Sequence, residues 1–293
     1  MNSNTMTHTP SSAQLAAYQA RNPDKPVVLF YRYRSNPGTD AASIATRLDQ
    51  LARMHGGQVD WSGAEEQALI GPVQLYGHCC LLRFRLRDAA LRHIQDSRHA
   101  EALRDVDQLE VTAISDQPRL SRLVIRLLAC VLPWVRFDNT TENTPEPGLG
   151  TSIMPSEQDL ATFMAHPRQT TPVVMINWLR FRPTAKYDRP DTKQITGQAA
   201  YYLYGKAAFA AIHSLGGRAF FISRYQQVLI GNGGDPGKDL WNEFVLVEYP
   251  GRATFKHMAS LKRYRAGLVH RQAGLAENGQ GLVVSVSLPP ARG

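Results

Sequence analysis

The sequence predicts an α+β fold built from two copies of one β-α-β-β-α-β unit, and three observations predict it. Residues 26–34 have the sequence PVVLFYRYR, and 146 positions later residues 172–183 have the sequence PVVMINWLRFRP. Each of these strand-like segments precedes a helix-like stretch that stops at a Gly-Gly pair, Gly56-Gly57 or Gly216-Gly217. The same order of strand and helix patterns then follows in both halves, which indicates an internal repeat.

The elements of the first half can be predicted in order from their sequence patterns. After the first strand, Ile44, Leu48, Leu51 and Met54 recur near helical spacing, and the Gly-Gly pair ends that helix. The remaining patterns predict two strands, a helix and a closing strand. The predicted elements are a strand at 26–34, a helix at 40–57, strands at 58–71 and 78–86, a helix from 87, and a strand at 109–115.

The second half repeats these elements at offsets that grow along the chain. Tyr201, Gly205, Ala208 and Ile212 share one face of its first helix. Because the offset grows from 146 to 160 before this helix, the second half has a longer loop at 184–196. The predicted elements are a strand at 172–183, a helix at 196–217, strands at 218–231 and 243–250, a helix from 251, and a strand at 281–287.

The order β-α-β-β-α-β is that of the split β-α-β, or ferredoxin-like, unit, whose antiparallel sheet carries both helices on one face. The other face of each sheet must be covered, and two units can cover both by packing sheet to sheet. We therefore predict tandem ferredoxin-like units that form an intramolecular dimeric barrel. The predicted boundaries are a polar leader at 1–25, a diverged first unit at 26–116, an amphipathic helix and linker at 117–153, and a second unit at 154–293.

Residues from about 154 to 288 resemble the DUF1330 family of dimeric α/β-barrel proteins. The resemblance rests on MPSEQDLATFMAHP, VVMINWLRF, YYLYG, LGGR, LVEYPGRATFKHM and YRAGLVHRQAGL. The first half resembles the same superfamily only by order and spacing, because FYRYR replaces INWLR and the YxxYG pattern is absent. The resemblance implies a pocket between sheet and helices and chemistry that depends little on cofactors. The reactions it implies include polyketide-type cyclisation, lactone isomerisation and quinone-forming oxygenation.

Composition narrows the classes of function. The chain has 43% hydrophobic and 20% charged residues, as in ordinary globular proteins, and a net charge of +8. Four arginines lie in residues 119–137, and no other basic cluster or nucleic-acid-binding motif appears, so we do not expect nucleic acid as a partner. Cys79 and Cys80 are adjacent in a predicted strand, and no spacing completes a metal set. Without a nucleotide-binding glycine motif either, we expect no cofactor, no metal and a cytoplasmic location.

The segment 119–137 is not part of the repeat. Arg119, Arg122 and Arg126 fall on one helical face opposite an apolar stripe, and the uncharged run at 127–135 is too short to span a bilayer. One interpretation, which we favour narrowly, is a connector packed on the barrel or on another subunit. The other is a helix that lies on an anionic membrane surface, at the inner face of the membrane.

The repeated strand supplies two candidate site residues in the second unit. Strand alternation places Asn177 on one side and Arg180 on the other. Asn177 among apolar neighbours is either a structural hydrogen-bonding group, which is favoured, or a substrate anchor. Arg180 recurs as Arg34, which favours an ion pair at a strand end over a clamp for a carboxylate or enolate oxygen.

Histidine and tyrosine supply the candidates for proton transfer. His257 repeats as His93, and a surface or packing role is the more common one for any single histidine. Tyr204 belongs to the family-like YxxYG pattern, and Tyr201 lies three residues before it. Glu243, on a predicted strand, either orients a histidine or lines the edge of the sheet.

The sequence thus favours a small cofactor-independent enzyme that transfers protons on a hydrophobic carbonyl, polyketide-like or aromatic compound, as a cyclase, an isomerase or a cofactor-free oxygenase. In this hypothesis Tyr204 and His257 are catalytic, and Asn177, Arg180, Tyr201 and Glu243 bind the substrate. The alternative is a non-catalytic protein that binds a small molecule or docks on a membrane. A homodimer is compatible with both.

Overall fold

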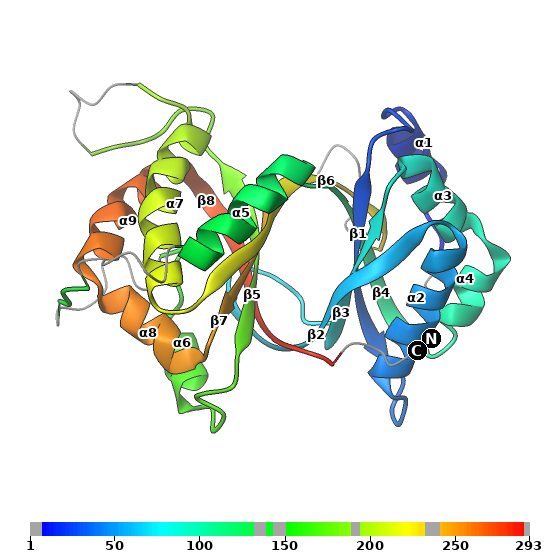
Figure 1. Cartoon of the computed structure of the whole chain (residues 1–293), viewed down its shortest axis with the longest axis horizontal. Helices are drawn as coiled ribbons and strands as arrows, with labels where there is room; N and C mark the ends of the chain where they lie inside the picture. The colour runs from blue at the N-terminus through cyan, green and yellow to red at the C-terminus, as the bar shows by residue number, and fades with distance from the viewer. Residues whose placement is uncertain (1–7, 132–138, 143–150, 189–193, 232–240, 290–293) are drawn as a thin grey trace, which may run out of the picture.

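The chain folds as an intramolecular dimeric α/β barrel, seen in the computed structural model of Figure 1, with one layer of helices on each outer side. The structure describes residues 8–131, 139–142, 151–188, 194–231 and 241–289. The predicted β-α-β-β-α-β order occurs twice, and the predicted fold class is confirmed.

The first unit places its helices on one face of four strands. Its strands are β1 (Val27–Ser35), β2 (Gly57–Ile70), β3 (His78–Phe84) and β4 (Val106–Ser115). Its helices are α2 (Ala41–Met54), α3 (Arg87–Gln95) and α4 (Ser97–Ala102), preceded by α1 (Ser12–Gln19). The second helix of the repeat is interrupted at Asp96, whose backbone is extended and whose side chain caps α4.

The second unit repeats this arrangement. Its strands are β5 (Val173–Phe181), β6 (Arg218–Ile230), β7 (Glu243–Tyr249) and β8 (Leu275–Ser287). Its helices are α6 (Glu157–Ala165), α7 (Gly197–Ser214), α8 (Arg252–Ser260) and α9 (Lys262–Gly274). Here too an extended residue, Leu261, divides the second helix of the repeat.

The two sheets join along both edges. The strand order around the barrel is β1-β3-β2-β8-β5-β7-β6-β4, and all of these pairs are antiparallel. β2 pairs with β8 and β4 pairs with β6, so neither unit keeps a free sheet edge along these strands. The closure satisfies backbone groups that an isolated unit would expose.

Strand alternation sorts the side chains into an interior and two outer cores. Phe30, Trp178 and Phe244 meet inside the barrel, with ring centroids 4.8–6.2 Å apart. The opposite faces of the strands pack against helices, so Cys79 lies in the barrel interior and Cys80 in the first helix-covered core.

The repeated Gly-Gly pairs have a backbone reason. Gly56 and Gly216, which follow α2 and α7, have φ of 73° and 79°. Residues with a side chain rarely adopt these values, so glycine suits the turn that ends each helix.

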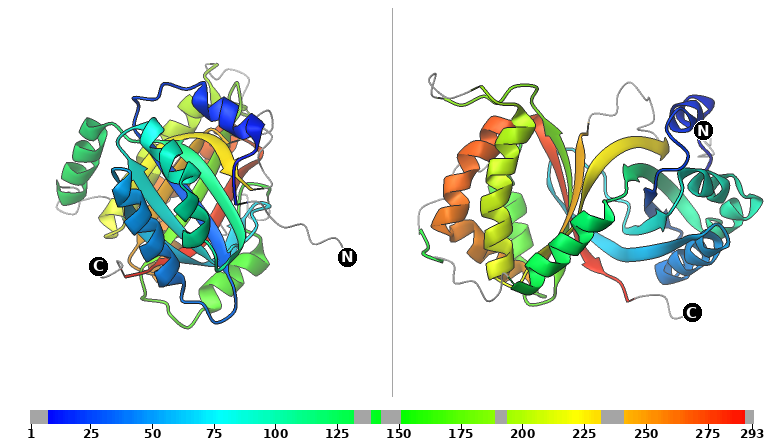
Figure 2. Two further views of the ribbon diagram at one scale, coloured as in Figure 1. Left: turned by 90° about the vertical axis from the view of Figure 1, so that its right-hand side faces the viewer. Right: turned by 45° about the horizontal axis from the view of Figure 1, so that its top comes forward.

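Helix α5 (Arg119–Val131) lies between the two helical layers, alongside β6 (Figures 1 and 2). Five of the apolar side chains that the structure describes on this helix are exposed to between 44% and 71%, namely Leu120, Leu123, Val124, Leu127 and Val131. The expectation that this stripe packs on the barrel was therefore wrong, whereas its alternative, a contact with another subunit, stays a prediction. Residues 132–137 lie outside the described part of the chain.

Among the described residues, no helix combines the length and the apolar character needed to cross a membrane. The same residues contain no cluster of three or more histidine, cysteine or acidic side chains suited to a metal ion.

Candidate functional site

A cavity of about 430 Å³ lies between the sheet of the second unit and its helices α7, α8 and α9. Its floor is the helix-facing side of the sheet, where strand alternation directs Met175, Asn177 and Val245. Tyrosines of α7 and α9 form much of the opposite wall. Most of the lining is apolar or aromatic, with a few polar groups, which is typical of a site for a hydrophobic small molecule.

A chain of hydrogen bonds links three polar side chains on the cavity wall. Arg271 of α9 donates to Oε1 of Gln280 on β8, and Gln280 Nε2 donates to Asn177 Oδ1 on β5 over 3.0 Å. Asn177 Nδ2 in turn donates to the Met175 carbonyl at 3.1 Å. Both polar atoms of Asn177 are thus satisfied by the protein, as the structural interpretation of this residue expects.

Arg271 is the notable charge of this cavity. Its side chain is 3% exposed and also donates to the Ile153 carbonyl and to the Met154 sulfur. No carboxylate in the described part of the chain forms an ion pair with it. A buried charge without a counter-charge is costly, so a guanidinium here favours a ligand with a negative or strongly polar oxygen.

Glu243 and Tyr202 form a second polar pair at the cavity. Glu243 is 6% exposed, and Tyr202 donates from its hydroxyl to Glu243 Oε2 at 2.8 Å. Burial raises the pKa of the Glu243 carboxyl, and the Tyr202 hydrogen bond and the Arg224 charge oppose this rise. A carboxyl whose pKa is raised toward neutrality is better able to accept and return a proton.

Three tyrosines crowd the wall opposite the sheet. The Tyr204 hydroxyl donates to the Tyr264 hydroxyl at 3.3 Å, and the Tyr201 ring lies 5.3 Å from the Tyr204 ring. The Arg271 guanidinium lies 5.9 Å from the centre of the Tyr204 ring. Burial raises the pKa of Tyr201 well above its usual value, with Tyr204 adding to the rise, so the Tyr201 phenol is neutral near pH 7.

Of the six residues predicted from the sequence, four line this cavity: Asn177, Tyr201, Tyr204 and Glu243. Arg180 does not, because strand alternation places it on the other side of β5, where it donates to the Glu277 carbonyl at 2.5 Å. Arg34, its counterpart, donates to the Leu75 carbonyl at 3.0 Å. The repeated arginines thus share a contact with a backbone carbonyl, and neither forms an ion pair with a described residue.

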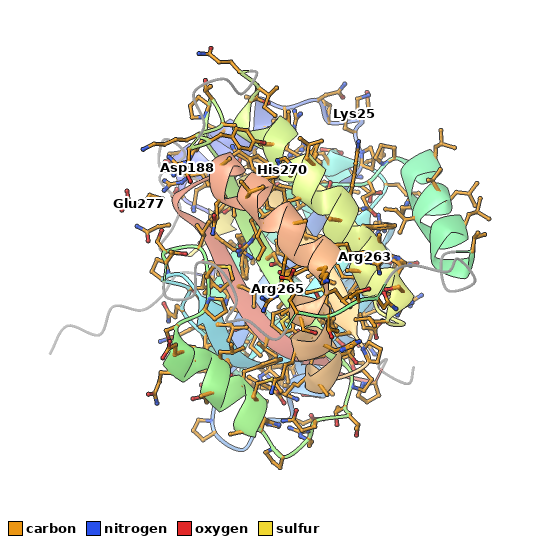
Figure 3. The ribbon with its side chains drawn as sticks, turned by 90° about the vertical axis from the view of Figure 1, so that its left-hand side faces the viewer. Lys25, Asp188, Arg263, Arg265, His270 and Glu277 are labelled. Carbon is orange, nitrogen blue, oxygen red and sulfur yellow. The ribbon has the colours of Figure 1, made fainter. Side chains whose placement is uncertain are left out.

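His257 does not line the cavity either, since it lies on the exposed side of α8. No histidine occurs among the described residues that line the cavity. His270 lies on α9, in the helical layer (Figure 3), and its Nδ1 is 2.8 Å from the Tyr187 hydroxyl. The structure therefore does not bring Tyr204 together with a histidine.

In the first unit, side chains fill the space between the sheet and the helices. Tyr31, which occupies the repeat position of Asn177, lies 3.1 Å from His93 Nε2 and 3.0 Å from His99 Nε2. Burial lowers the pKa of His93 to about 3 and that of His99 to about 4. These side chains belong to the hydrophobic core between sheet and helices.

Sequence reasoning missed Arg271, Gln280, Tyr202 and Tyr264. A signal for Arg271 was present, because Tyr264, Leu268 and Arg271 follow helical spacing and so place an arginine on an apolar face. Gln280 has no such signal. It lies next to Gly279 and Gly281 in a segment whose pairing with β5 is set by the tertiary fold.

Comparison with known proteins gives structural neighbours only. No protein-family model matches the chain, and no curated protein matches it either. A protein of unknown function from Rhodopseudomonas palustris, RPA0582, is 32% identical over 47% of this chain and 98% of its own, with a TM-score of 0.41. The DUF1330 resemblance therefore stays a prediction.

Other solved structures match nearly the whole chain at low identity. A mutant chlorite dismutase from Candidatus Nitrospira defluvii is 10% identical over 91% of this chain and 92% of its own, with a TM-score of 0.43. A monooxygenase-like protein from Lactobacillus acidophilus is 8% identical over 90% and 94%, with a TM-score of 0.40. The neighbours thus include RPA0582-like proteins and proteins of the dimeric α/β-barrel type.

Proposed function

We propose that the cavity of the second unit binds a hydrophobic carbonyl or aromatic compound of polyketide-like character and catalyses proton transfer on it. The observation that carries the proposal is Arg271, which is buried in a mostly apolar cavity and forms no ion pair with a carboxylate of the described residues. An arginine in this position can hold the oxygen of a carbonyl and the enolate that forms from it. The apolar lining accommodates the rest of the molecule.

In this proposal the polar groups have separate roles. The Glu243 carboxylate removes a proton from the carbon beside the carbonyl, and the electron pair moves to the oxygen, which becomes an enolate held by Arg271. When the molecule binds, the Tyr204 hydroxyl gives up its hydrogen bond to Tyr264 and donates to the bound molecule instead. Return of the proton from Glu243 to a different carbon completes an isomerisation. If the Glu243 carboxyl first exchanges its proton with solvent, return to the same carbon gives solvent exchange.

The proposal changes two roles assigned from the sequence. Arg271 takes the oxygen-binding role expected of Arg180, and Glu243 takes the proton-accepting role expected of His257. Tyr204 keeps its role, and Asn177 supports Arg271 through Gln280. Tyr201 forms part of the wall against which the ligand packs.

Solvent exchange of acidic carbon-bound protons tests the chemistry directly. Aromatic 1,3-diketones in D2O, with the protein at catalytic concentration, are followed by proton NMR. We expect the protein to accelerate loss of the signal of the methylene between the two carbonyls. Glu243→Gln should slow this exchange by about 100-fold or more, since general acid–base catalysis contributes at least that much.

The matched control is Glu248→Gln on the same strand. Glu248 belongs to the opposite face of β7 and pairs with Arg218 outside the cavity. The Glu248→Gln variant should exchange the diketone protons at the rate of the wild type. Equal exchange rates with and without protein, for diketones that bind in the cavity, would refute the catalytic role.

A second candidate function is peripheral docking on a membrane, and the exposed apolar stripe of α5 favours it. A second copy of the chain could cover the same stripe, which would give a homodimer. In either case α5, and not the cavity of the second unit, would carry the interaction. The two candidates are compatible with each other, because the residues of the stripe do not line this cavity.

A further inference from the structure

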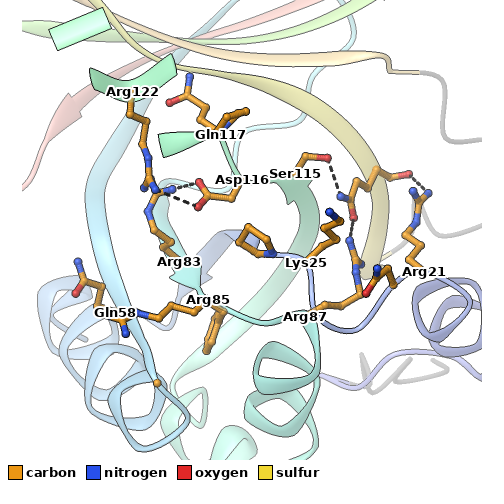
Figure 4. Close-up of a pocket in the computed structure, with 16 residues that line it drawn as sticks. Arg21, Lys25, Gln58, Arg83, Arg85, Arg87, Ser115, Asp116, Gln117 and Arg122 are labelled. Carbon is orange, nitrogen blue, oxygen red and sulfur yellow. Dashed lines mark hydrogen bonds and ion pairs between the residues drawn. The ribbon is translucent and has the colours of Figure 1, made fainter. Parts of the chain in front are cut away.

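A second cavity, of about 810 Å³, lies at one end of the strands of the first unit (Figure 4). It is bounded by the segment between α1 and β1, the end of β3, the start of β2, the end of β4 and the start of α5. Six of its lining side chains are basic and one is acidic. The basic residues are Arg21, Lys25, Arg83, Arg85, Arg87 and Arg122, and the acidic one is Asp116.

The geometry of an extended chain explains why three of the six basic residues lie together. Arg83, Arg85 and Arg87 alternate along the end of β3 and the extended residues after it, and Leu86 between them has φ of −130° and ψ of 140°. Side chains two residues apart on an extended chain point to the same side. The sequence RFRLR therefore directs three guanidinium groups toward one cavity.

The single carboxylate is already engaged. Arg83 and Arg122 meet at Asp116 on one side of the cavity (Figure 4), with Arg122 Nη2 3.7 Å from Asp116 Oδ2. Within the described part of the chain, Arg21, Lys25, Arg85 and Arg87 form no ion pair with any carboxylate. Four positive charges in this cavity thus have no ion-pair partner among the described residues.

Arg87 adds an observation independent of the surface charges. Its side chain is only 4% exposed, and its Nε and Nη1 have no hydrogen-bond partner among the described residues. Its Nη2 donates to Gln226 Oε1 at 2.5 Å, and its guanidinium lies 4.4 Å from the centre of the Tyr18 ring. Burial lowers the pKa of Arg87, Tyr18 opposes this, and Arg21 adds to it. A buried cation in this state is stabilised by an anion placed beside it.

We propose that this cavity is a binding site for a phosphate-bearing ligand, with Arg21, Lys25, Arg85 and Arg87 as its cationic groups. Guanidinium groups match the oxygens of phosphate in paired hydrogen bonds, and lysine adds a point charge. Four uncompensated cations call for more than the single charge of a carboxylate. A diphosphate group supplies that charge, and the volume of the cavity is in the range of small-molecule sites.

The test is isothermal titration calorimetry of the full-length protein with inorganic pyrophosphate at low salt. We expect saturable binding at one site, a raised melting temperature, and weakening as salt rises, since salt screens exposed charges. Orthophosphate, with fewer charges, should bind more weakly. Absence of pyrophosphate binding at low salt would overturn the proposal.

A double variant, Lys25→Gln with Arg85→Gln, removes two exposed charges of the cavity without disturbing a buried group. It should weaken pyrophosphate binding at least tenfold. The matched control is Lys256→Gln with Lys262→Gln, two exposed lysines of α8 and α9 with the same change of charge. The control should bind within twofold of the wild type. Equal weakening by both pairs would show nonspecific attraction and would contradict the site.

Vesicles distinguish a lipid headgroup from a soluble phosphate as the source of this group. If vesicles that contain phosphatidic acid sediment with the protein and pyrophosphate releases it, the cavity binds a headgroup. If pyrophosphate binds and the vesicles do not sediment with the protein, the ligand is soluble. Arg87→Met gives a further measurement, since it should abolish the stabilisation by pyrophosphate while the variant keeps the circular dichroism of the wild type.

Discussion

At the scale of single residues, the molecule uses similar positions for different purposes in its two units. The repeat position of Tyr31 is Asn177, and one belongs to a buried core while the other lines a cavity. Tyr31 meets two neutral histidines, whereas Asn177 is connected to Arg271 through Gln280. A polar residue in a sheet is therefore structural or functional depending on what packs above it.

Tyr31→Phe should lower the free energy of unfolding by about 1–3 kcal/mol, because His93 and His99 each lose a buried hydrogen-bond partner. Urea unfolding measures the effect. The same variant should leave ligand binding in the second unit unchanged, whereas Tyr204→Phe and Asn177→Ala should weaken it. A loss of ligand binding in Tyr31→Phe that matches the loss in Tyr204→Phe would count against asymmetric units.

The rate of proton exchange should rise with pH through an apparent pKa above 4.5, because burial raises the pKa of Glu243 and only its ionised form accepts a proton. The Tyr202 hydrogen bond lowers that pKa, so Tyr202→Phe should move the rise to higher pH. The pH dependence of exchange measures both. Tyr187→Phe, which removes a hydroxyl bonded to His270 outside the cavity, is the control and should leave the profile unchanged.

At the scale of elements, α5 differs from the other described helices because five of its described apolar side chains face solvent. The other described helices bury apolar residues against the sheets, whereas five large apolar side chains of α5 are exposed. Arg122 of the same helix reaches the basic cavity through Asp116. A helix with an exposed apolar stripe and basic residues beside it is typical of attachment to an anionic membrane surface.

The paired change Leu123→Ser with Leu127→Ser should reduce sedimentation of the protein with anionic vesicles several-fold and leave the melting temperature nearly unchanged, since both side chains are already exposed. Neutral vesicles should bind less than anionic ones, and added salt should release the protein. If no lipid-dependent sedimentation occurs at low salt, docking on a membrane is excluded. A dimer that dissociates in this variant would instead assign the stripe to a second copy.

At the scale of the whole molecule, the two units share one sheet. The contacts of β2 with β8 and of β4 with β6 tie the units together through backbone hydrogen bonds, and Phe30 of one packs on Phe244 of the other. If one unit unfolds, the other therefore loses both its strand partners at the sheet edges and its packing in the barrel interior. Each of the two cavities then lies mainly against one unit, the hydrophobic one on the second and the basic one on the first.

We expect the protein to unfold in one cooperative transition, because separating the units exposes the barrel interior and two sheet edges at once. Urea titrations followed by tryptophan fluorescence and by circular dichroism should coincide. Two resolved transitions, one for each unit, would contradict this expectation.

The sequence by itself determined the repeat, the order of the elements and the inward and outward faces of the strands. These follow from local rules, since alternation along a strand places Asn177 opposite Arg180, and glycine ends α2 and α7 where φ is positive. Four of the six candidate site residues line the cavity for the same reason. Their spacing sorts them by face, but the sequence assigned both Asn177 and Arg180, on opposite faces of β5, to the site, and the packed helices decide which face lines the cavity.

Only the tertiary structure decided which distant groups meet. Arg271 and Gln280 join Asn177 because β8 pairs with β5 and α9 packs beside α7 over the sheet, and no local spacing contains that contact. His257 and Arg180 carry suitable chemistry but lie on faces turned away from the cavity. The four cations of the basic cavity come from two segments, residues 21–25 and 85–87, which meet because β1 pairs with β3.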